Sequence, residues 1–311
     1  MSLIVVALGG NAILRPGQKG TYQEQIANIE LTANSIVNLL REGHRVIVTH
    51  GNGPQVGNVL IQHEAAKGQV PAQPLDVCGA QTQGQIGYMI QNCLDNHINK
   101  IGIDIPVVTI ITRVRVDSND LAFDHPTKPI GPFFDKDHAE QKIADGESWM
   151  EDSGRGWRRI VPSPEPIEII ELEMIKVLTN SGGLVVAGGG GGIPVIEKNG
   201  ELEGIEAVID KDFVASRLAC DIDADFFLIL TDVNKVALNY GAPEQKNLDC
   251  LSVKDAIIYL EEGQFGIGSM GPKIRAAVNF VKNASGTAII TSLDKLNLAL
   301  QGLDGTRIVK E

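Results

Sequence analysis

Residues 3–11 read LIVVALGGN, an aliphatic run that ends in two glycines and an asparagine. A short run of Ile, Val and Leu is typical of a strand that is covered on both faces. No basic leader precedes the run, so it is not typical of a signal peptide. We predict a buried strand whose carboxyl end opens into a glycine loop.

Similar runs recur along the chain, and helical periodicity lies between them. The further predicted strands are Val46–Thr49, Pro106–Thr112, Leu184–Ala187, Phe226–Thr231 and Ala288–Thr291. Apolar side chains at three- and four-residue steps predict helices over Tyr22–Glu42, Ile167–Leu178 and Pro272–Val281, and a further helix is expected over Asp212–Cys220. This alternation predicts an α/β fold, a three-layer α/β/α sandwich around a mainly parallel sheet.

Two segments interrupt the alternation. Between Val116 and Pro166 the chain is rich in Asp, Pro, Gly and isolated aromatic residues. Structureless loops of this length are uncommon in compact domains unless they are functional, so we predict a small inserted lid subdomain over about residues 116–166. A long surface loop is the alternative. Farther on, Asn199–Gly200 predicts a hairpin between Ile193–Glu197 and Glu203–Val208.

Composition limits the classes of function. The chain has 311 residues, and its net charge of −12 disfavours binding to nucleic acid or to an anionic membrane. The cysteines show no paired short spacing and the histidines no metal-ligand spacing, so we predict neither a disulfide framework nor a protein metal site. No apolar run reaches membrane-spanning length, and we expect a cytoplasmic protein of about two domains.

Glycine loops follow the first two predicted strands. Gly9–Gly10–Asn11 ends the first strand, and Gly51–Asn52–Gly53–Pro54 ends the second and opens a helix. Glycines let a phosphate approach backbone N–H groups, and a helix N-terminus adds favourable partial charge. The spacing of Gly51, Gly53 and Gly57 is one residue too long for a dinucleotide fingerprint, so an NAD site is a distant alternative. Gly188–Gly192 either lies against a ligand or forms a hinge.

Three lysines lie far apart in the sequence in loop-like surroundings. Lys211 stands between Asp210 and Asp212 before a predicted helix, and Lys128 and Lys273 each adjoin prolines. Three converging cations would match the spread negative charge of a phosphoryl-transfer transition state. His50 either touches substrate or is a buried structural residue. Ser153 and Ser269 lack an identifiable base, so serine hydrolysis has no support.

Five motifs together resemble carbamate kinases, within the amino acid kinase family. The resemblance spans nearly the whole chain, and the motifs occur in that family's order. They are Val6–Ala12, Thr49–Gly57, Pro126–Phe133, Ala207–Asp212 and Gly268–Lys273.

The resemblance implies that different parts of the chain bind the two substrates. Residues 1–221, with the inserted lid, would hold the phosphoryl acceptor, and residues 222–311 would hold ATP or ADP. Lys211 and Lys273 would neutralise phosphates, Asp212 would align these lysines, and Lys128 would close onto the acceptor. The implied phosphate and carbamate ligands are Gly9, Gly10, Asn11, Gly51, Asn52 and Gly53. The implied nucleotide contacts are Thr231, Asp232, Val233, Tyr240, Ser269 and Met270.

The implied reaction is reversible phosphoryl transfer between carbamoyl phosphate and ADP, giving ATP and carbamate. Mg²⁺ would accompany the nucleotide, and a homodimer active in arginine metabolism is implied as well. A carboxylate kinase acting on an amino-acid derivative is the nearest rival, and it would have a roomier acceptor pocket. A non-catalytic sensor of nucleotide or carbamoyl phosphate is a second alternative.

Overall fold

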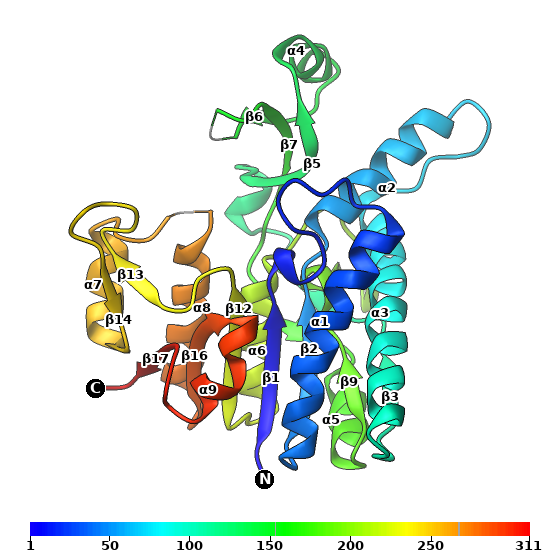
Figure 1. Cartoon of the computed structure of the whole chain (residues 1–311). Helices are drawn as coiled ribbons and strands as arrows, with labels where there is room; N and C mark the ends of the chain where they lie inside the picture. The colour runs from blue at the N-terminus through cyan, green and yellow to red at the C-terminus, as the bar shows by residue number, and fades with distance from the viewer. Residues whose placement is uncertain (153, 267) are drawn as a thin grey trace.

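Strand β1 lies inside an eight-stranded sheet (Figure 1). The structure is a computed structural model that describes residues 1–152, 154–266 and 268–311. From one edge to the other, the sheet contains β15 (Cys250–Ser252), β17 (Thr306–Val309), β16 (Thr287–Ser292), β12 (Phe226–Thr231), β1 (Leu3–Leu8), β2 (Arg45–His50), β9 (Leu184–Val186) and β3 (Val107–Thr109). Neighbouring strands are parallel except β16 and β17, so the predicted mainly parallel sheet is confirmed.

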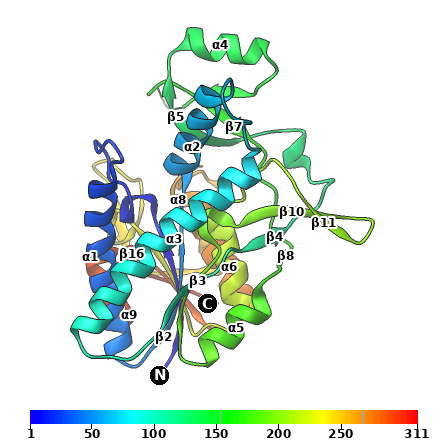
Figure 2. The ribbon, with the colours of Figure 1, turned by 90° about the vertical axis from the view of Figure 1, so that its right-hand side faces the viewer.

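The side chains of β1 alternate between two hydrophobic cores. Leu3, Val5 and Ala7 enter the core formed with α5 (Leu172–Asn180), α6 (Lys211–Asp221), α7 (Val253–Glu261) and α8 (Met270–Asn283). The intervening residues enter the core formed with α1 (Tyr22–Arg41), α3 (Leu75–Lys100) and α9 (Leu296–Leu300). Each fully buried aliphatic side chain contributes about 1.5–3 kcal/mol. The two helical layers enclose the sheet (Figure 2), which confirms the predicted sandwich.

Local sequence signals account for most element boundaries. Helix α1 begins at a capping box, in which the Thr21 side chain accepts from the Glu24 N–H and the Glu24 carboxylate accepts from the Thr21 N–H. Helix α5 begins at Leu172, five residues after the predicted start at Ile167, because Glu168–Ile169 instead forms strand β8 beside β4 (Arg113–Arg115).

A second sheet of four strands, in the order β11-β10-β4-β8, adjoins the insertion. The predicted hairpin is present as β10 (Ile193–Lys198) and β11 (Glu201–Gly204), and Asn199 and Gly200 both have positive φ. The second strand was predicted to continue to Val208. It runs from Glu201 to Gly204, and beyond it the Val208 N–H donates to the carbonyl of Pro162 instead of to β10. A short hairpin of β13 (Val236–Leu238) and β14 (Lys246–Leu248) lies farther along the chain.

The insertion is a folded subdomain that stands above the carboxyl ends of the main strands (Figure 1). Its described residues contain a three-stranded sheet, ordered β5-β7-β6, together with an α-helix and a short 3₁₀ helix: β5 (Lys128–Phe134), α4 (Lys136–Ala144), β6 (Trp149–Glu151), β7 (Trp157–Val161) and η2 (Leu121–Phe123). It rests on α2 (Gly53–Ala66), where a Cβ added to Gly57 would lie 1.9 Å from the Gly131 Cα. Ile130 and Val161 pack into a small core with α2. Strand β5 therefore seats closely on the main body.

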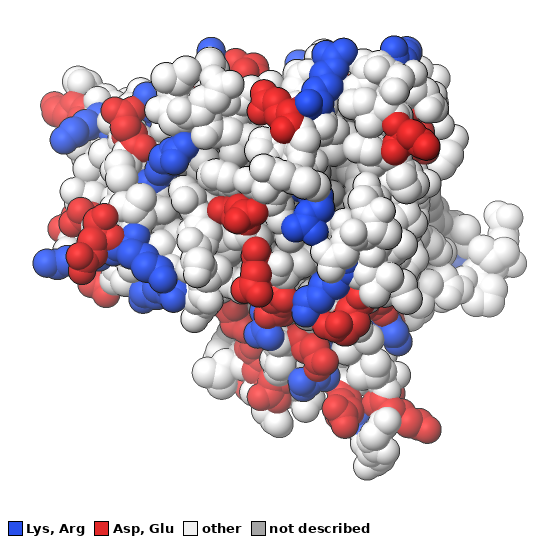
Figure 3. All heavy atoms as spheres, turned by 90° about the horizontal axis from the view of Figure 1, so that it is seen from below, with Lys and Arg blue, Asp and Glu red and all other residues white. Residues whose placement is uncertain are grey.

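Acidic and basic side chains interleave on the face opposite the insertion (Figure 3). The chain carries 27 basic and 39 acidic residues, so acidic side chains outnumber basic ones. Among the described residues, every helix is too short or too polar to cross a membrane.

Candidate active site

The loops after β1, β2 and β12 line two adjoining cavities at one edge of the main sheet. The larger has a volume of about 1200 Å³ and the smaller about 200 Å³. They share Gly10, Gly268, Ser269 and Lys273 in their linings. In open parallel sheets, ligands bind outside the carboxyl ends of the strands. A group could therefore pass from one cavity to the other beside Lys273.

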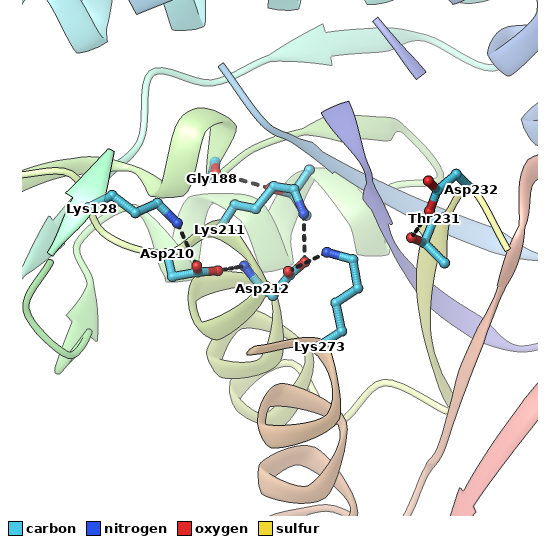
Figure 4. Close-up of polar contacts among 9 residues, drawn as sticks. Lys128, Gly188, Asp210, Lys211, Asp212, Thr231, Asp232 and Lys273 are labelled. Carbon is cyan, nitrogen blue, oxygen red and sulfur yellow. Dashed lines mark hydrogen bonds and ion pairs between the residues drawn. The ribbon is translucent and has the colours of Figure 1, made fainter. Parts of the chain in front are cut away.

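The three predicted cations converge on the smaller cavity (Figure 4). Asp212 accepts from two of them at once: Lys211 Nζ lies 2.6 Å from Oδ1, and Lys273 Nζ lies 2.9 Å from Oδ2. Lys128 is the first residue of β5, and its Nζ donates to Asp210 Oδ2 at 2.6 Å. Elements more than 80 residues apart thus bring their charges to one place.

The charges in this cluster depend on one another. Burial opposes ionisation of Asp212, but Lys211 and Lys273 outweigh it and hold the pKa of the carboxyl well below its usual range. Burial lowers the pKa of Lys211, and the neighbouring Lys273 lowers it further. Burial also opposes charge on Lys273, but Asp212, Asp210 and Asp232 outweigh it and raise that pKa. One buried carboxylate therefore holds two ammonium groups beside the cavity.

Three helix N-termini also border the smaller cavity. Its lining includes residues from the first turns of α2, α6 and α8, which begin at Gly53, Lys211 and Met270. Backbone N–H groups at helix N-termini have no intrahelical partner, and the helix dipole favours an anion there. Gly51 also makes room for a cation, since a Cβ there would lie 3.3 Å from Lys211 Cδ. The cavity is built to receive negative charge.

The predicted glycine-loop residues divide between the two cavities. Gly9 and Asn11 line the larger one, Gly10 lines both, and Gly51, Asn52 and Gly53 line the smaller one. The predicted nucleotide contacts all line the larger cavity, namely Thr231, Asp232, Val233, Tyr240, Ser269 and Met270. Sequence reasoning missed other residues in its lining, including Arg15, Lys235, Asn239, Gln264 and Asp294, because no motif marks them.

The five-glycine run Gly188–Gly192 supports the second loop from beneath. Gly188, Gly189, Gly190 and Gly191 are buried, and Gly192 is partly exposed. A Cβ on Gly189 would lie 2.4 Å from His50 Nε2, and a Cβ on Gly190 would lie 2.3 Å from Asn52 Nδ2. Gln83 on α3 donates to the Gly189 carbonyl at 2.9 Å. The glycine run therefore packs against His50 and Asn52, at the end of β2. Within the run, Gly190 lines the smaller cavity.

Comparison with known proteins agrees with this geometry. The family model described as the amino acid kinase family matches residues 2–292. The chain belongs to the amino acid kinase family.

Relatives of this amino acid kinase extend over its full length. It is 51% identical to a carbamate kinase of Thermococcus kodakarensis, with 100% of both chains covered, and 50% identical to one of Pyrococcus horikoshii, with 98% of both covered. A solved carbamate kinase from Giardia lamblia bound to AMP-PNP superposes with a TM-score of 0.93 at 42% identity, covering 100% of this chain and 99% of that one. The resemblance to carbamate kinases is confirmed.

Asp210 is the main residue of this kinase's site whose role the sequence did not predict. Its Oδ1 accepts from the Asp212 N–H at 2.9 Å and so caps α6, while its Oδ2 pairs with Lys128. The sequence placed Asp210 next to Lys211, but nothing in the sequence indicated that the lid lysine would reach it.

Further observations concern possible metal ligands and the two serines. Among the described residues, no three His, Cys, Asp or Glu side chains are grouped so that they could hold a metal ion. Ser269 lines both cavities. The prediction for Ser153 lies outside the described residues, as does Ile267 in the loop before α8.

His50 is a buried structural residue of this kinase. Its side chain lies between Gly189 and the Gly51 carbonyl, which is 3.0 Å from Nδ1, and the residue is 1% exposed. Burial lowers the pKa of His50 from 6.5 to about 4, and the charge of Lys211 contributes.

This pKa shift predicts a loss of stability in acid. Between pH 6.5 and 4 the unfolded chain binds a proton at His50 that the folded chain does not, so the contribution is complete above pH 6.5 and falls as the pH drops. At pH 4.5 the expected loss from this residue is about 2 kcal/mol. Urea unfolding of wild type and His50→Gln at pH 7.5 and 4.5 isolates the contribution of His50. Only wild type should show this additional loss of stability at the lower pH. Equal losses in both proteins would contradict the assignment.

Proposed function

We propose that this amino acid kinase is a carbamate kinase, which transfers a phosphoryl group reversibly between carbamoyl phosphate and ADP to give ATP and carbamate. The observation that carries the proposal is the pair of adjoining cavities, which meet at Gly10 and Lys273. The larger suits a nucleotide, and the smaller, lined by three lysines, suits a compact anionic acceptor.

The size of the smaller cavity favours carbamate over a bulkier carboxylate. At about 200 Å³ it is smaller than the roughly 300–1,000 Å³ of sites that enclose drug-sized ligands. Ile130 and Pro129 of the closely seated β5 form part of its wall. A kinase acting on an amino-acid derivative would need more room on this side.

In the proposed mechanism, the protein promotes transfer by aligning the substrates and neutralising negative charge on the phosphoryl group. A carbamate oxygen attacks the terminal phosphoryl group of ATP in line, and the bond to the ADP oxygen breaks. Carbamate is already an anion, so the step needs no general base. Lys211 and Lys273 neutralise charge on the moving group, and Asp212 fixes their ammonium groups. Lys128 binds the acceptor end, and backbone N–H groups of the glycine loops and helix N-termini complete the cradle.

The same proposal implies a Mg²⁺ ion, a division of the chain into two functional parts, and a homodimer. Asp232 and Asp294 line the larger cavity, which fits a cation that arrives with the nucleotide, because Mg²⁺ is usually held by substrate phosphates with one or two carboxylates. When bound, it would neutralise nucleotide phosphate charge. We further propose that residues 1–221 serve the acceptor and residues 222–311 the nucleotide, in a cytoplasmic homodimer.

A coupled assay of ATP formation from carbamoyl phosphate and ADP tests the proposal. The expected result is saturable turnover that depends on both substrates. Binding of both without turnover would instead favour a sensor. If ATP is consumed with an N-acetylated amino acid while carbamoyl phosphate gives no product, the chain is a carboxylate kinase of another kind.

A further inference from the structure

Asp210 joins the insertion to the start of α6 through a single carboxylate. One oxygen accepts from the Asp212 N–H at 2.9 Å, and the other lies 2.6 Å from Lys128 Nζ (Figure 4). The Asp210 side chain is 14% exposed and that of Lys128 32% exposed. Because the carboxylate is largely buried and is also held by the start of α6, this ion pair constrains both partners more than a pair with a fully exposed acid does.

Asp210 lies among several other charged groups. Glu165, in the segment that returns from the insertion, is close enough to Asp210 for their charges to interact. Burial raises the pKa of Glu165, and the nearby carboxylates of Asp120 and Asp210 raise it further. Asp210 also interacts with the charges of Lys211 and Lys273, but the ammonium group that it contacts directly is that of Lys128 on β5. The pair holds that strand's first residue over the smaller cavity.

We propose that Asp210 is a positioning residue for the acceptor side of the site, which acts by holding the Lys128 ammonium over the smaller cavity. The proposal rests on the proposed function for its kinetic meaning, but the ion pair itself can be tested without turnover. Without Asp210's charge, the flexible Lys128 side chain would spend more time in solvent, and carbamoyl phosphate would meet a less organised site.

Asp210→Asn separates the two roles of the carboxylate. The asparagine carbonyl oxygen can still cap α6, because Asn is as good an N-cap as Asp, but it has no charge for Lys128. We expect the KM for carbamoyl phosphate to rise about tenfold and the KM for ADP to change less than about twofold. Asp135→Asn is the matched control, since Asp135 caps α4 through the same kind of bond to the His138 N–H.

The same substitution in a Lys128→Met background decides whether Asp210 acts through Lys128. If it does, Asp210→Asn should change the KM for carbamoyl phosphate less than about twofold there, because the partner is already gone. An equal rise in both backgrounds, or an unchanged KM in the wild-type background, would overturn the proposal.

A chemical readout keeps this test independent of activity. An amine-directed acetylating reagent, followed by peptide mass spectrometry, should modify Lys128 about tenfold faster in Asp210→Asn than in wild type, because the ion pair shields the amine. Lys176, which pairs with Glu173 on the surface, serves as the internal reference. Faster labelling without carbamoyl phosphate turnover in wild type would refute the proposed function only. Unchanged labelling of Lys128 would refute the positioning role.

Discussion

Lys211→Ala is expected to lower kcat for ATP formation from carbamoyl phosphate and ADP by about 10³-fold, the upper range for loss of one preorganised electrostatic donor. Lys211 is buried beside the smaller cavity, and Gly51 leaves it room there. The substitution removes a positive charge that neutralises the moving phosphoryl group, at a place where solvent cannot easily replace it. Steady-state kinetics with both substrates at saturation measure the effect.

The fold should survive this substitution. Asp212 keeps Lys273 as a partner at 2.9 Å, and the desolvation cost of Lys211 is removed along with its charge. The free energy of unfolding should therefore stay within about 2 kcal/mol of wild type. Lys176→Ala, which removes a surface lysine from α5, is the matched control and should leave kcat unchanged. A kcat within threefold of wild type in Lys211→Ala would remove Lys211 from the mechanism.

Asp212→Asn should have the largest effect on stability and turnover together. Asp212 is 3% exposed and holds the ammonium groups of Lys211 and Lys273. With a neutral amide in its place, two largely buried cations face each other without the carboxylate that contacts both. Breaking a buried ion pair from one side costs about 3–5 kcal/mol. Urea unfolding measures this loss, and kcat should fall about 10³-fold as the lysines lose their alignment.

Added anion should partly reverse the destabilisation. Inorganic phosphate can neutralise the two lysines that have lost their carboxylate, so it should raise the Tm of Asp212→Asn more than that of wild type. Asp221→Asn is the control at the other end of α6, where Asp221 pairs with the partly exposed Arg217, and its cost should not exceed about 1 kcal/mol. If both variants lose the same stability, the buried cluster is not the cause.

The main strands could be predicted closely because their signal is local. Leu3–Leu8 and Phe226–Thr231 were assigned with the observed boundaries, since a strand buried on both faces needs an unbroken apolar run. Helix α1 was equally clear, because its apolar stripe begins at a cap and ends before Gly43.

Helix α3 was missed because its buried face is not simply apolar. Thr82, Gln83 and Gly87 lie on that face, where the first two hydrogen-bond to buried loops and Gly87 allows Thr109 to approach. Only the partners of these residues in the fold make them core residues. The second sheet escaped prediction for a similar reason, since β4 and β8 are very short and become strands only by pairing with each other and with β10.

The sequence by itself determined the layered α/β fold, the glycine loops at the strand ends and the identity of the three lysines, because apolar periodicity and glycine spacing are written in neighbouring residues. The resemblance implied that Asp212 would align two of these lysines, and the structure shows the contacts. Tertiary structure alone decided that Asp210 would hold the third lysine and that the cavity beside them would be small. Charge pairing and cavity volume depend on distances between segments remote in the chain, which local sequence patterns do not encode.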